Sequence, residues 1–416
     1  MYIKSLHAEN LRCFRHIALD LQYPGRSSGA AALPNVNLLV GNNGAGKTTV
    51  LKALALASIS PVLESSGFVP YRLVRRADDE QPSHATMRAT VMLHGQDLGT
   101  KNRRDAREEA VAVVVERIRD SERINADRMK EAYWENLYDE RSPAFLIVGY
   151  GANRRVEAAR TFDEGLRRRS RQLRYERVAG LFEEQATLTP LGSWLPQLRS
   201  ENPGRHRQVV NLINRLLPDE CRFADKQESG ESLFEMRGAP VPFAALSDGY
   251  RAYIGWVTDL LYHVWLGTPS GAKLVDSRGV VLVDEIDLHL HPEWQRVVVP
   301  RLAVALPSMQ FVMTSHSPIV AGTLESRNIL VSEPDESGAS TVRQLQERIH
   351  GLSAEQILLS PYFNLLTTRA PAAEDELSAA ARRARSGDTK AAVAYLKLLT
   401  EGTDPAAENA TKVRGA

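Results

Sequence analysis

The sequence predicts an α/β fold in which helices cover both faces of a parallel sheet. Val36–Val40 is a short apolar run that ends at Gly41, and helically spaced apolar residues follow from Thr48 to Ala57. Two further apolar runs, Val280–Val283 and Gln310–Thr314, are separated by a helical stretch. Buried strands that alternate with helices are typical of parallel sheets. These observations fix the fold class.

Length and composition limit this interpretation. A chain of 416 residues exceeds the usual size of one compact core and suits two closely joined lobes. Hydrophobic residues at 43% and charged residues at 25% are ordinary for a folded globular protein. With 52 Lys and Arg against 51 Asp and Glu, the net charge favours no class of partner. Only a local cluster of basic residues would therefore indicate nucleic acid.

Nothing in the sequence predicts export or membrane insertion. The two cysteines, Cys13 and Cys221, provide no disulfide framework, so a reducing compartment is expected. No apolar run reaches the roughly 18 residues that a membrane span needs, and Met1–Leu6 lacks the apolar centre of a secretory signal. We therefore expect a cytoplasmic protein that makes no contact with a membrane.

Shorter patterns predict the remaining elements. Residues 2–7 and 16–21 alternate apolar and polar side chains, which is typical of half-buried strands. The tail from Pro371 to Ala416 is rich in alanine and predicts two short helices divided at Gly387. Between residues 60 and 240 the patterns predict strands at His84–His94, Glu109–Arg119 and Phe145–Val148. They also predict a charged helix at Ser121–Glu140 and an amphipathic helix at Arg205–Leu217.

A phosphate-binding loop joins the first buried strand to its helix. Gly41-Asn42-Asn43-Gly44-Ala45-Gly46-Lys47-Thr48 fits the pattern G-x-x-x-x-G-K-[ST]. Glycines are needed there because backbone N–H groups must curl inward around a phosphate, and the following helix directs its positive end at the same anion. We expect Lys47 to reach the outer phosphates and the Thr48 hydroxyl to bind Mg²⁺. A glycine-rich turn that matches by chance is disfavoured by the strand before it and the helix after it.

An acidic pair follows a later buried strand. Val280–Val283 leads directly into Asp284 and Glu285, and parallel strands bring the residues at their carboxyl ends to the edge of the sheet where ligands bind. We expect Asp284 to hold Mg²⁺ through its water shell, because that ion prefers oxygen ligands. Glu285 is the candidate for orienting or deprotonating an attacking water. The alternative is two acids at the start of a surface helix.

Two weaker motifs surround this pair. Leu246–Arg251 precedes a long apolar-periodic helix from Ala252 to Leu266, and Ser247 or Asp248 is suited to cap it. By itself this motif indicates only the start of a helix. His316 follows the strand Gln310–Thr314 and is a candidate for contacting a γ-phosphate, although a lone histidine is more often an ordinary polar residue.

The order of these four motifs resembles that in the nucleotide-binding heads of ABC-type ATPases, on the branch with SMC, Rad50 and RecF proteins. Asp284–Pro292 is similar to the E-x-x-x-H-L-H-P run of bacterial ATPases that include OLD-type proteins, and Asn10–Phe14 to the N-F-R-x-F start of RecF-like heads. Leu246–Arg251 and Gly149–Arg154 resemble a group of small ATP-binding proteins. That group is similar to the ATPase subunit of Septu-type anti-phage systems and to some retron-associated ATPases.

The resemblance covers residues 1–60 and 240–335 and departs from the family at two points. The signature reads Ser-Asp-Gly-Tyr instead of Ser-Gly-Gly-Gln, which speaks against a transporter subunit. The glutamine that usually binds Mg²⁺ after the middle strand is not found, and Asn153 is the nearest substitute. As a whole, the resemblance implies an ABC-type P-loop NTPase head with a mixed sheet. Its halves would be residues 1–60 and 241–345, with a helical insertion lobe at 61–240 and a small helical tail at 346–416.

The resemblance also implies a site shared by two copies of the chain, in which Ser247 and Gly249 of one copy face the ATP held by the other. Catalysis of ATP hydrolysis would fall to Lys47, Glu285 and His316, and Mg²⁺ would be bound by Thr48 and Asp284. The nucleotide contacts that follow from the matched motifs are Arg12, Asn42, Asn43, Gly44, Ala45, Gly46, Lys47, Thr48, Thr49, Ser247, Asp248 and Gly249.

Contact with nucleic acid rests on one basic segment. Its arginines are Arg154, Arg155, Arg160, Arg167, Arg168, Arg169, Arg171, Arg174 and Arg177. They form either a solvated helix face or a non-specific, salt-dependent surface for a DNA or RNA backbone. Val331–Asp335 is similar to the first acidic strand of a Toprim nuclease, but no Asp-x-Asp pair follows it, and two-metal cleavage needs clustered carboxylates. We expect no intrinsic nuclease.

Two functional hypotheses follow. The first is an ATPase that gates an anti-phage defence complex, in which a separate effector nuclease does the cutting. The second is a DNA-maintenance ATPase that acts as an ATP-closed clamp in repair or recombination. Both require a homodimer closed at its ATP sites.

Overall fold

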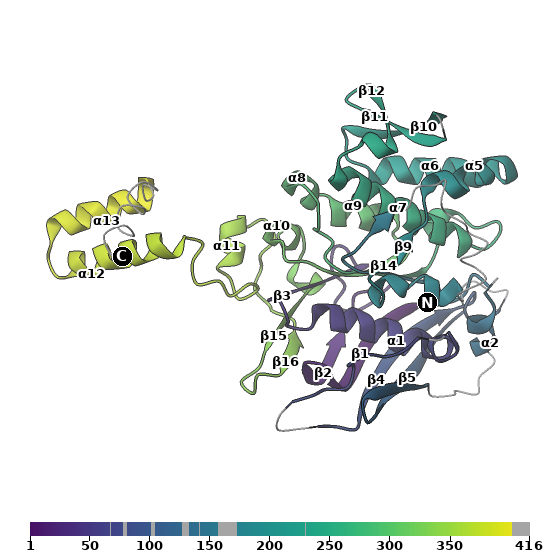
Figure 1. Cartoon of the computed structure of the whole chain (residues 1–416), viewed down its shortest axis with the longest axis horizontal. Helices are drawn as coiled ribbons and strands as arrows, with labels where there is room; N and C mark the ends of the chain where they lie inside the picture. Colours follow the sequence, from purple (N-terminus) through teal and green to yellow (C-terminus); the bar gives the residue numbers. More distant parts are fainter. Residues whose placement is uncertain are drawn as a thin grey trace. The chain divides into compact units, whose positions relative to one another are not determined.

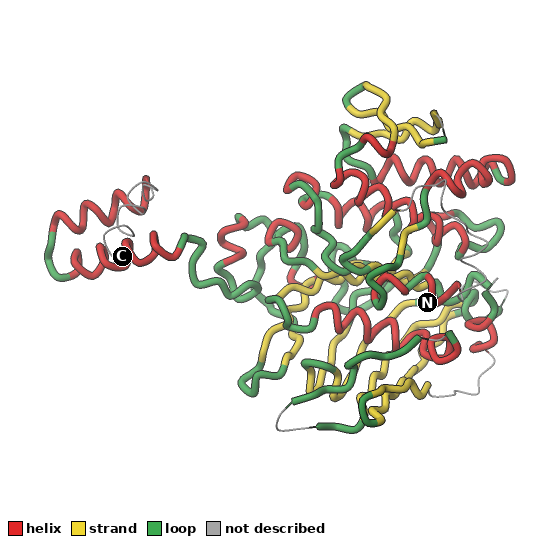
Figure 2. Tube along the Cα trace, in the orientation of Figure 1, coloured by secondary structure: helices red, strands yellow, loops and turns green. Residues whose placement is uncertain are grey.

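The structure, a computed structural model, describes residues 1–66, 68–77, 81–100, 105–126, 133–140, 142–156, 173–228 and 230–401. The chain divides into two units, Met1–Ala354 and Glu355–Ala416. Figure 1 labels the helices and strands, and Figure 2 shows how strands and helices are distributed along the same trace. Within the described ranges, no helix is both long enough and apolar enough to cross a membrane.

The buried apolar runs form a six-stranded sheet in the order β16-β15-β3-β14-β13-β7. Its strands are β3 (Val36–Gly41), β7 (Ile147–Tyr150), β13 (Gly279–Val283), β14 (Met309–Thr314), β15 (Ile329–Pro334) and β16 (Ser340–Arg343). All pairs are parallel except that of β15 with β16. The predicted mixed α/β sheet is therefore confirmed, and the carboxyl ends of β3, β13 and β14 meet at one edge.

A second, antiparallel sheet lies below the first in Figure 1, in the order β2-β1-β4-β5-β6. Its strands are β1 (Tyr2–Leu11), β2 (Phe14–Asp20), β4 (His84–His94), β5 (Ala106–Ile118) and β6 (Ser121–Ala126). Helix α1 (Lys47–Ser65) contacts strands of both sheets. Because protein covers it on two sides, α1 is apolar around most of its circumference rather than along one stripe.

The section from residue 61 to residue 240 is not a separate helical lobe, contrary to the expectation from sequence. Strands β4, β5 and β6 extend the sheet that begins with β1, and β7 is the edge strand of the core sheet. These pairings draw the section into the same unit as both halves of the head. Long-range strand pairing of this kind leaves little trace in a local sequence pattern.

The predicted helix at Ser121–Glu140 is wrong over its first third, which is strand β6. The side chains of Glu122 and Ile124 are buried while their neighbours are exposed, so the strand has the usual alternation. A buried carboxylate hid this pattern, because Glu122 occupies an inward position in order to accept hydrogen bonds from the backbone N–H groups of Leu73 and Val74. Only α2 (Tyr133–Tyr138) is helical in the described part of this stretch.

Figure 1 shows a group of helices on the side of the core sheet opposite α1. They are α5 (Leu191–Glu201), α6 (Pro203–Leu216), α7 (Asp248–Leu266) and α9 (Val298–Ala305), and α6 contacts the other three. A small antiparallel sheet of β10 (Cys221–Glu228), β11 (Glu231–Met236) and β12 (Ala239–Pro242) follows α6. Two short strands, β8 (Arg155–Val156) and β9 (Thr187–Leu188), pair in parallel. Helix α7, predicted from Ala252 to Leu266, contacts α5, α6, β8 and β9, and its residues 253–264 are all buried.

The second unit contains a helical hairpin. Helices α12 (Pro371–Arg385) and α13 (Thr389–Glu401) pack against each other, and Gly387 between them has a φ of 93°. Glycine suits this turn because other residues rarely adopt a positive φ. The two predicted helices, divided at Gly387, are therefore confirmed.

Candidate functional site

The phosphate loop is shaped by two glycines whose surroundings leave no room for a side chain. At Gly41, where φ is +142°, a Cβ atom would stand 2.0 Å from the carbonyl oxygen of Ser332 on β15. At Gly46, where φ is +96°, it would stand 2.5 Å from the ring of Phe14. The loop therefore starts and ends at positions that only glycine fills without displacing a neighbour.

Lys47 closes this loop on itself. Its side chain is buried, and Nζ donates hydrogen bonds to the carbonyl oxygens of Gly41, at 2.8 Å, and Asn42, at 3.0 Å. Burial lowers the pKa of Lys47, and the nearby carboxylates of Asp284 and Glu285 offset part of that effect. A buried cation that donates its hydrogen bonds to neutral carbonyl oxygens is well placed to bind an anion that enters the loop.

Three elements meet at the carboxylate of Asp284. The hydroxyl of Thr48, in the first turn of α1, donates to Oδ2 at 2.8 Å, and the hydroxyl of Thr314, at the end of β14, donates to Oδ1 at 2.6 Å. Asp284 itself follows β13 and is buried. Thr314 is not among the residues predicted from the sequence. Its position, a polar residue at the end of the buried strand β14, is the pattern that could have indicated it.

Glu285 follows in an uncommon backbone conformation, with a φ of +49°. Its backbone N–H donates to the Thr314 hydroxyl at 2.7 Å, and the next N–H, of Ile286, donates to the Thr314 carbonyl oxygen at 2.9 Å. The side chain of Glu285 is half-buried. The chain thus turns sharply where the strand ends, and the second carboxylate faces the phosphate loop.

A cleft of about 360 Å³ contains most of the predicted site residues. Its walls are Arg12, Cys13, Asn43, Gly44, Gly46, Lys47, Thr48, Thr49, Asp284, Glu285 and His316. A cation and loop amides form one side, and two carboxylates form the other. Mg²⁺ is a hard ion that takes oxygen ligands and keeps several waters, and the Thr48 hydroxyl and Asp284 carboxylate are oxygen donors of that kind. Asn42 and Ala45 belong to the loop but do not line the cleft.

His316 enters the cleft from the segment after β14. Its backbone N–H donates to the carboxylate of Asp287 at 3.4 Å, and its ring is half-buried. Burial is the main reason why the pKa of His316 lies below its ordinary value, and the charge of Lys47 lowers it further. The imidazole is therefore neutral at pH 7, so one ring nitrogen donates a hydrogen bond and the other accepts.

The signature segment stands apart from this cleft. Ser247 is the N-cap residue of α7, as predicted, but its side chain makes no capping hydrogen bond. Ser247 and Asp248 are exposed, and neither they nor Gly249 line the cleft. A Cβ at Gly249 would stand 2.7 Å from the carbonyl oxygen of His289, so the first turn of α7 packs closely on the segment that follows Glu285.

The unusual tyrosine of the signature has a structural partner. The hydroxyl of Tyr250 donates to Glu220 at 2.8 Å, and the indole N–H of Trp294 donates to the same carboxylate oxygen at 3.0 Å. The rings of Tyr250 and Trp294 meet edge to face, with 4.2 Å between their centroids. This cluster ties α7 to α8 (Pro292–Gln295), which explains an aromatic residue where the family has glutamine.

The basic segment is largely directed inward where the structure describes it. Arg174 and Arg177 are buried, and Arg174 donates to backbone carbonyl oxygens, including that of Leu137 at 2.7 Å. Arg154 is half-buried beside the acidic pair, whereas Arg155 is exposed. The other predicted arginines, from residue 157 to residue 172, lie outside the described residues. Burial removes Arg174 and Arg177 from the predicted nucleic-acid surface.

Asn153, the substitute for the missing glutamine, lies away from the nucleotide cleft. It is exposed and lines a larger cavity of about 1200 Å³ between the segment after β7 and helix α7. Tyr150, at the end of β7, instead donates from its hydroxyl to the buried carboxylate of Asp259 at 2.8 Å. No local sequence pattern indicates this hydrogen bond, because Tyr150 and Asp259 are more than one hundred residues apart.

A strand, a glycine loop with a buried lysine and an adjacent Asp-Glu pair define a P-loop nucleotide-binding site. In agreement, residues 36–321 match the family described as "AAA domain, putative AbiEii toxin, Type IV TA system", and residues 1–68 match "AAA ATPase domain". The first match covers more than half of the chain. The chain belongs to this family of AAA ATPase domains, and its family implies that it binds a nucleotide.

Curated relatives include the Septu protein PtuA of Bacillus mycoides (strain KBAB4), 25% identical over 369 residues, which are 88% of this chain and 45% of the relative. The "Retron Ec83 probable ATPase" of Escherichia coli is 30% identical over 149 residues, 36% of this chain and 28% of the relative. The chain thus spans less than half the length of these relatives. The SMC head domain from Thermotoga maritima aligns with a TM-score of 0.46 and 14% identity, covering 83% of this chain and 100% of that one. A score at this level does not establish a shared fold.

The pKa of His316 should rise when Lys47 is replaced by Met, because the nearby cation disfavours protonation of the ring. Lys47→Arg keeps the charge and should leave the pKa low. NMR titration of the histidine ring signals, assigned with His316→Gln, measures both.

Folding lowers the pKa of His316 below its ordinary 6.5, so the unfolded state binds more protons and stability falls as the pH drops below about 6.5. A pKa at or above 6.5 in the unsubstituted protein would contradict the described environment.

Proposed function

We propose that this chain hydrolyses Mg²⁺-ATP and that two copies close around two nucleotides. The observation that carries the proposal is the meeting of Thr48, Asp284 and Thr314 beside the phosphate loop, where a hydroxyl and a carboxylate are oxygen donors of the kind that Mg²⁺ prefers. Glu285 stands in the same cleft. Positioned charges of both signs around one polyphosphate are what phosphoryl transfer requires.

In the proposed reaction, the phosphates of ATP lie along the loop from Gly44 to Thr49. Lys47 exchanges its hydrogen bonds to the loop carbonyls for bonds to phosphate oxygens. Thr48 and Asp284 would hold Mg²⁺, which would supply positive charge against the phosphates. Glu285 orients a water molecule that attacks the γ-phosphorus, and the Glu285 carboxylate accepts a proton from that water. The bond from the γ-phosphorus to the bridging oxygen breaks, which yields ADP and phosphate. Neutral His316 donates a hydrogen bond to a γ-phosphate oxygen.

The exposed signature supports the closed dimer. Ser247 presents a hydroxyl that makes no capping bond, at the N-terminus of a 19-residue helix, outside its own chain's cleft. A helix N-terminus favours an anion by roughly 0.3–1 kcal/mol when exposed and by up to about 2 kcal/mol when partly buried. The γ-phosphate in the cleft of a second copy is the anion that we assign to it. ATP would then favour the closed state and hydrolysis the open one, because ligands act through their different affinities for two states.

For the biological role, we propose an ATPase that gates an anti-phage defence complex. Support comes from the relatives, which are named for Septu and for retrons, and from the similarity to PtuA over most of the chain. We assign cutting to a separate effector nuclease. The clamp alternative depends on a basic surface for DNA, and burial of Arg174 and Arg177 weakens that alternative.

Glu285→Gln should bind ATP with nearly unchanged affinity, lose most ATP hydrolysis and accumulate as a closed dimer with ATP. The amide keeps the size of the side chain but cannot accept the proton of water. Phosphate release and light scattering after gel filtration measure the two effects. Glu293→Gln, an exposed position on α8, is the matched control and should behave as the unsubstituted chain does. Normal turnover by Glu285→Gln would remove Glu285 from the mechanism.

Mixing Lys47→Met with Ser247→Arg should restore ATPase activity that neither variant has alone. In a mixed dimer, one site carries both substitutions and the other carries neither, provided that each site takes its lysine and serine from different copies. Mixing Lys47→Met with a chain that carries both substitutions is the control, because no site then has its lysine. If the first mixture stays inactive while its mixed dimers are shown to form, the shared site is disproved.

The defence role predicts a second polypeptide bound to the chain. An affinity-tagged Glu285→Gln chain, expressed together with its neighbouring genes, should retain a nuclease protein. The amount retained should differ between samples with and without ATP. Mass spectrometry of the retained proteins identifies it. Retention of no nuclease in either nucleotide state would contradict the proposed gating, while leaving the ATPase assignment in place.

A further inference from the structure

Arg154 holds the two peptide groups on either side of Glu285. It follows β7, and its Nη2 donates to the carbonyl oxygens of Asp284 and of Glu285, the latter at 2.7 Å. Its Nε donates to the carbonyl oxygen of Gly151 at 3.1 Å, which anchors the side chain near its own backbone. The guanidinium therefore bridges the end of β7 and the turn that carries the second carboxylate.

The turn at Glu285 needs such support. A φ of +49° is sparsely populated by residues other than glycine and persists only where surrounding contacts hold it. The peptide group between Asp284 and Glu285 is held at both ends, because its carbonyl oxygen accepts from Arg154 and its N–H donates to the Thr314 hydroxyl at 2.7 Å. Arg154 also binds the following carbonyl, so the backbone on both sides of the Glu285 Cα is fixed.

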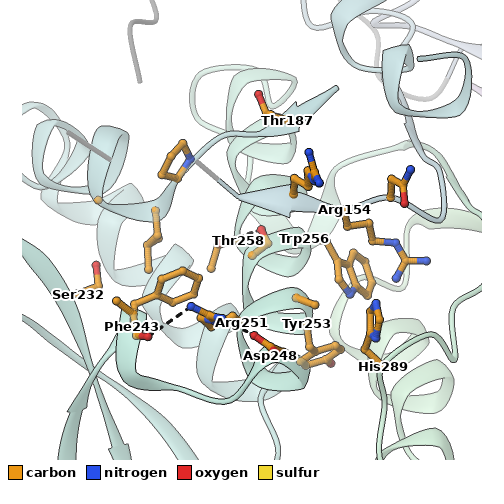
Figure 3. A pocket seen from close by; sticks show the side chains of 18 of the residues that line it. Arg154, Thr187, Ser232, Phe243, Asp248, Arg251, Tyr253, Trp256, Thr258 and His289 are labelled. Atoms are coloured by element: carbon orange, nitrogen blue, oxygen red, sulfur yellow. Dashed lines mark hydrogen bonds and ion pairs between the residues drawn. The ribbon is translucent and has the colours of Figure 1, made fainter. Parts of the chain in front are cut away.

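Arg154 is itself fixed from the side away from the nucleotide. Its guanidinium lies over the ring of Trp256, 5.7 Å from the centroid, and Trp256 is fully buried on α7. Figure 3 shows Arg154 beside Trp256 and above His289 in the wall of the larger cavity. Burial lowers the pKa of Arg154 to about 10, so the group stays charged at neutral pH. It does not line the cleft that contains Lys47.

We propose that Arg154 is a positioning residue for hydrolysis: it sets the direction of the Glu285 carboxylate without touching the nucleotide. The inference rests on the proposed function of Glu285 as the residue that orients water. It also replaces the interpretation of Arg154 as part of a nucleic-acid surface, because its donors are directed at backbone carbonyls of the same chain. Small errors in the position of a catalytic group lower a rate greatly while leaving binding intact.

The test compares Arg154→Met with Arg155→Met, an exposed neighbour in β8 that leaves the Glu285 turn untouched. Arg154→Met should lower kcat by about 10- to 100-fold and change the Kd for a fluorescent ATP analogue by less than about twofold. Arg155→Met should change neither. Arg154→Lys should recover part of kcat, because an ammonium donates to carbonyls but lacks the planar fork. If Arg154→Met fails to fold, as judged by thermal unfolding, Arg154→Lys against Arg155→Lys carries the same comparison.

A double-mutant cycle separates positioning from general support of the fold. In a Glu285→Gln background, the Arg154 substitution should cause little further loss of hydrolysis, because the group that it positions is already disabled. A loss as large as in the unsubstituted chain would overturn the inference, as would normal kcat in Arg154→Met or a loss of ATP affinity that accounts for the whole effect. If the unsubstituted chain hydrolyses no ATP, or if Glu285→Gln is fully active, the proposed function itself fails. A failure of the Arg154 inference alone looks different: the unsubstituted chain hydrolyses ATP, Glu285→Gln does not, and Arg154→Met has normal kcat.

Discussion

The hydrogen bonds that converge on Asp284 are the constraint on which the rest of the site depends. Thr48 and Thr314 each donate to one of its oxygens, so both sides of a buried carboxylate are satisfied from different elements. Buried charges are costly unless they are paired or hydrogen-bonded. Because one donor is in α1 and the other is at the end of β14, the carboxylate fixes the phosphate loop against the central sheet.

The two sheets make this arrangement possible. Helix α1 carries Lys47 and Thr48 and is enclosed between the core sheet and the antiparallel sheet that starts with β1. Its burial on two sides stabilises a helix whose first residue is a buried cation, since the apolar area removed from water offsets the desolvation of one charge. The long strands β4 and β5, which lie in the section expected to form an insertion lobe, serve as one wall of this enclosure.

The sequence predicted the parts of the site that are local. The strand, loop and helix around Gly41–Thr48, the acidic pair and the helix that begins after Ser247 are contiguous patterns, and each lies at the predicted position. Thr314 and Arg154 escaped prediction because their importance comes from contacts with Asp284 and Glu285, which lie at a distance along the chain. Arg154 was also masked by its basic neighbours. Strand β6 was missed because Glu122 stands where an apolar residue would reveal the alternation.

The close packing of Gly249 on the carbonyl of His289 has a consequence for timing. The first turn of α7 is the surface that we assign to the opposite nucleotide, and His289 is four residues beyond Glu285 in the same stretch of backbone. A displacement of one cannot leave the other still, because no slack exists between them. In the proposed dimer, departure of phosphate from one cleft would therefore act on the backbone beside Glu285 of the other copy. The two sites of such a dimer would therefore not act independently.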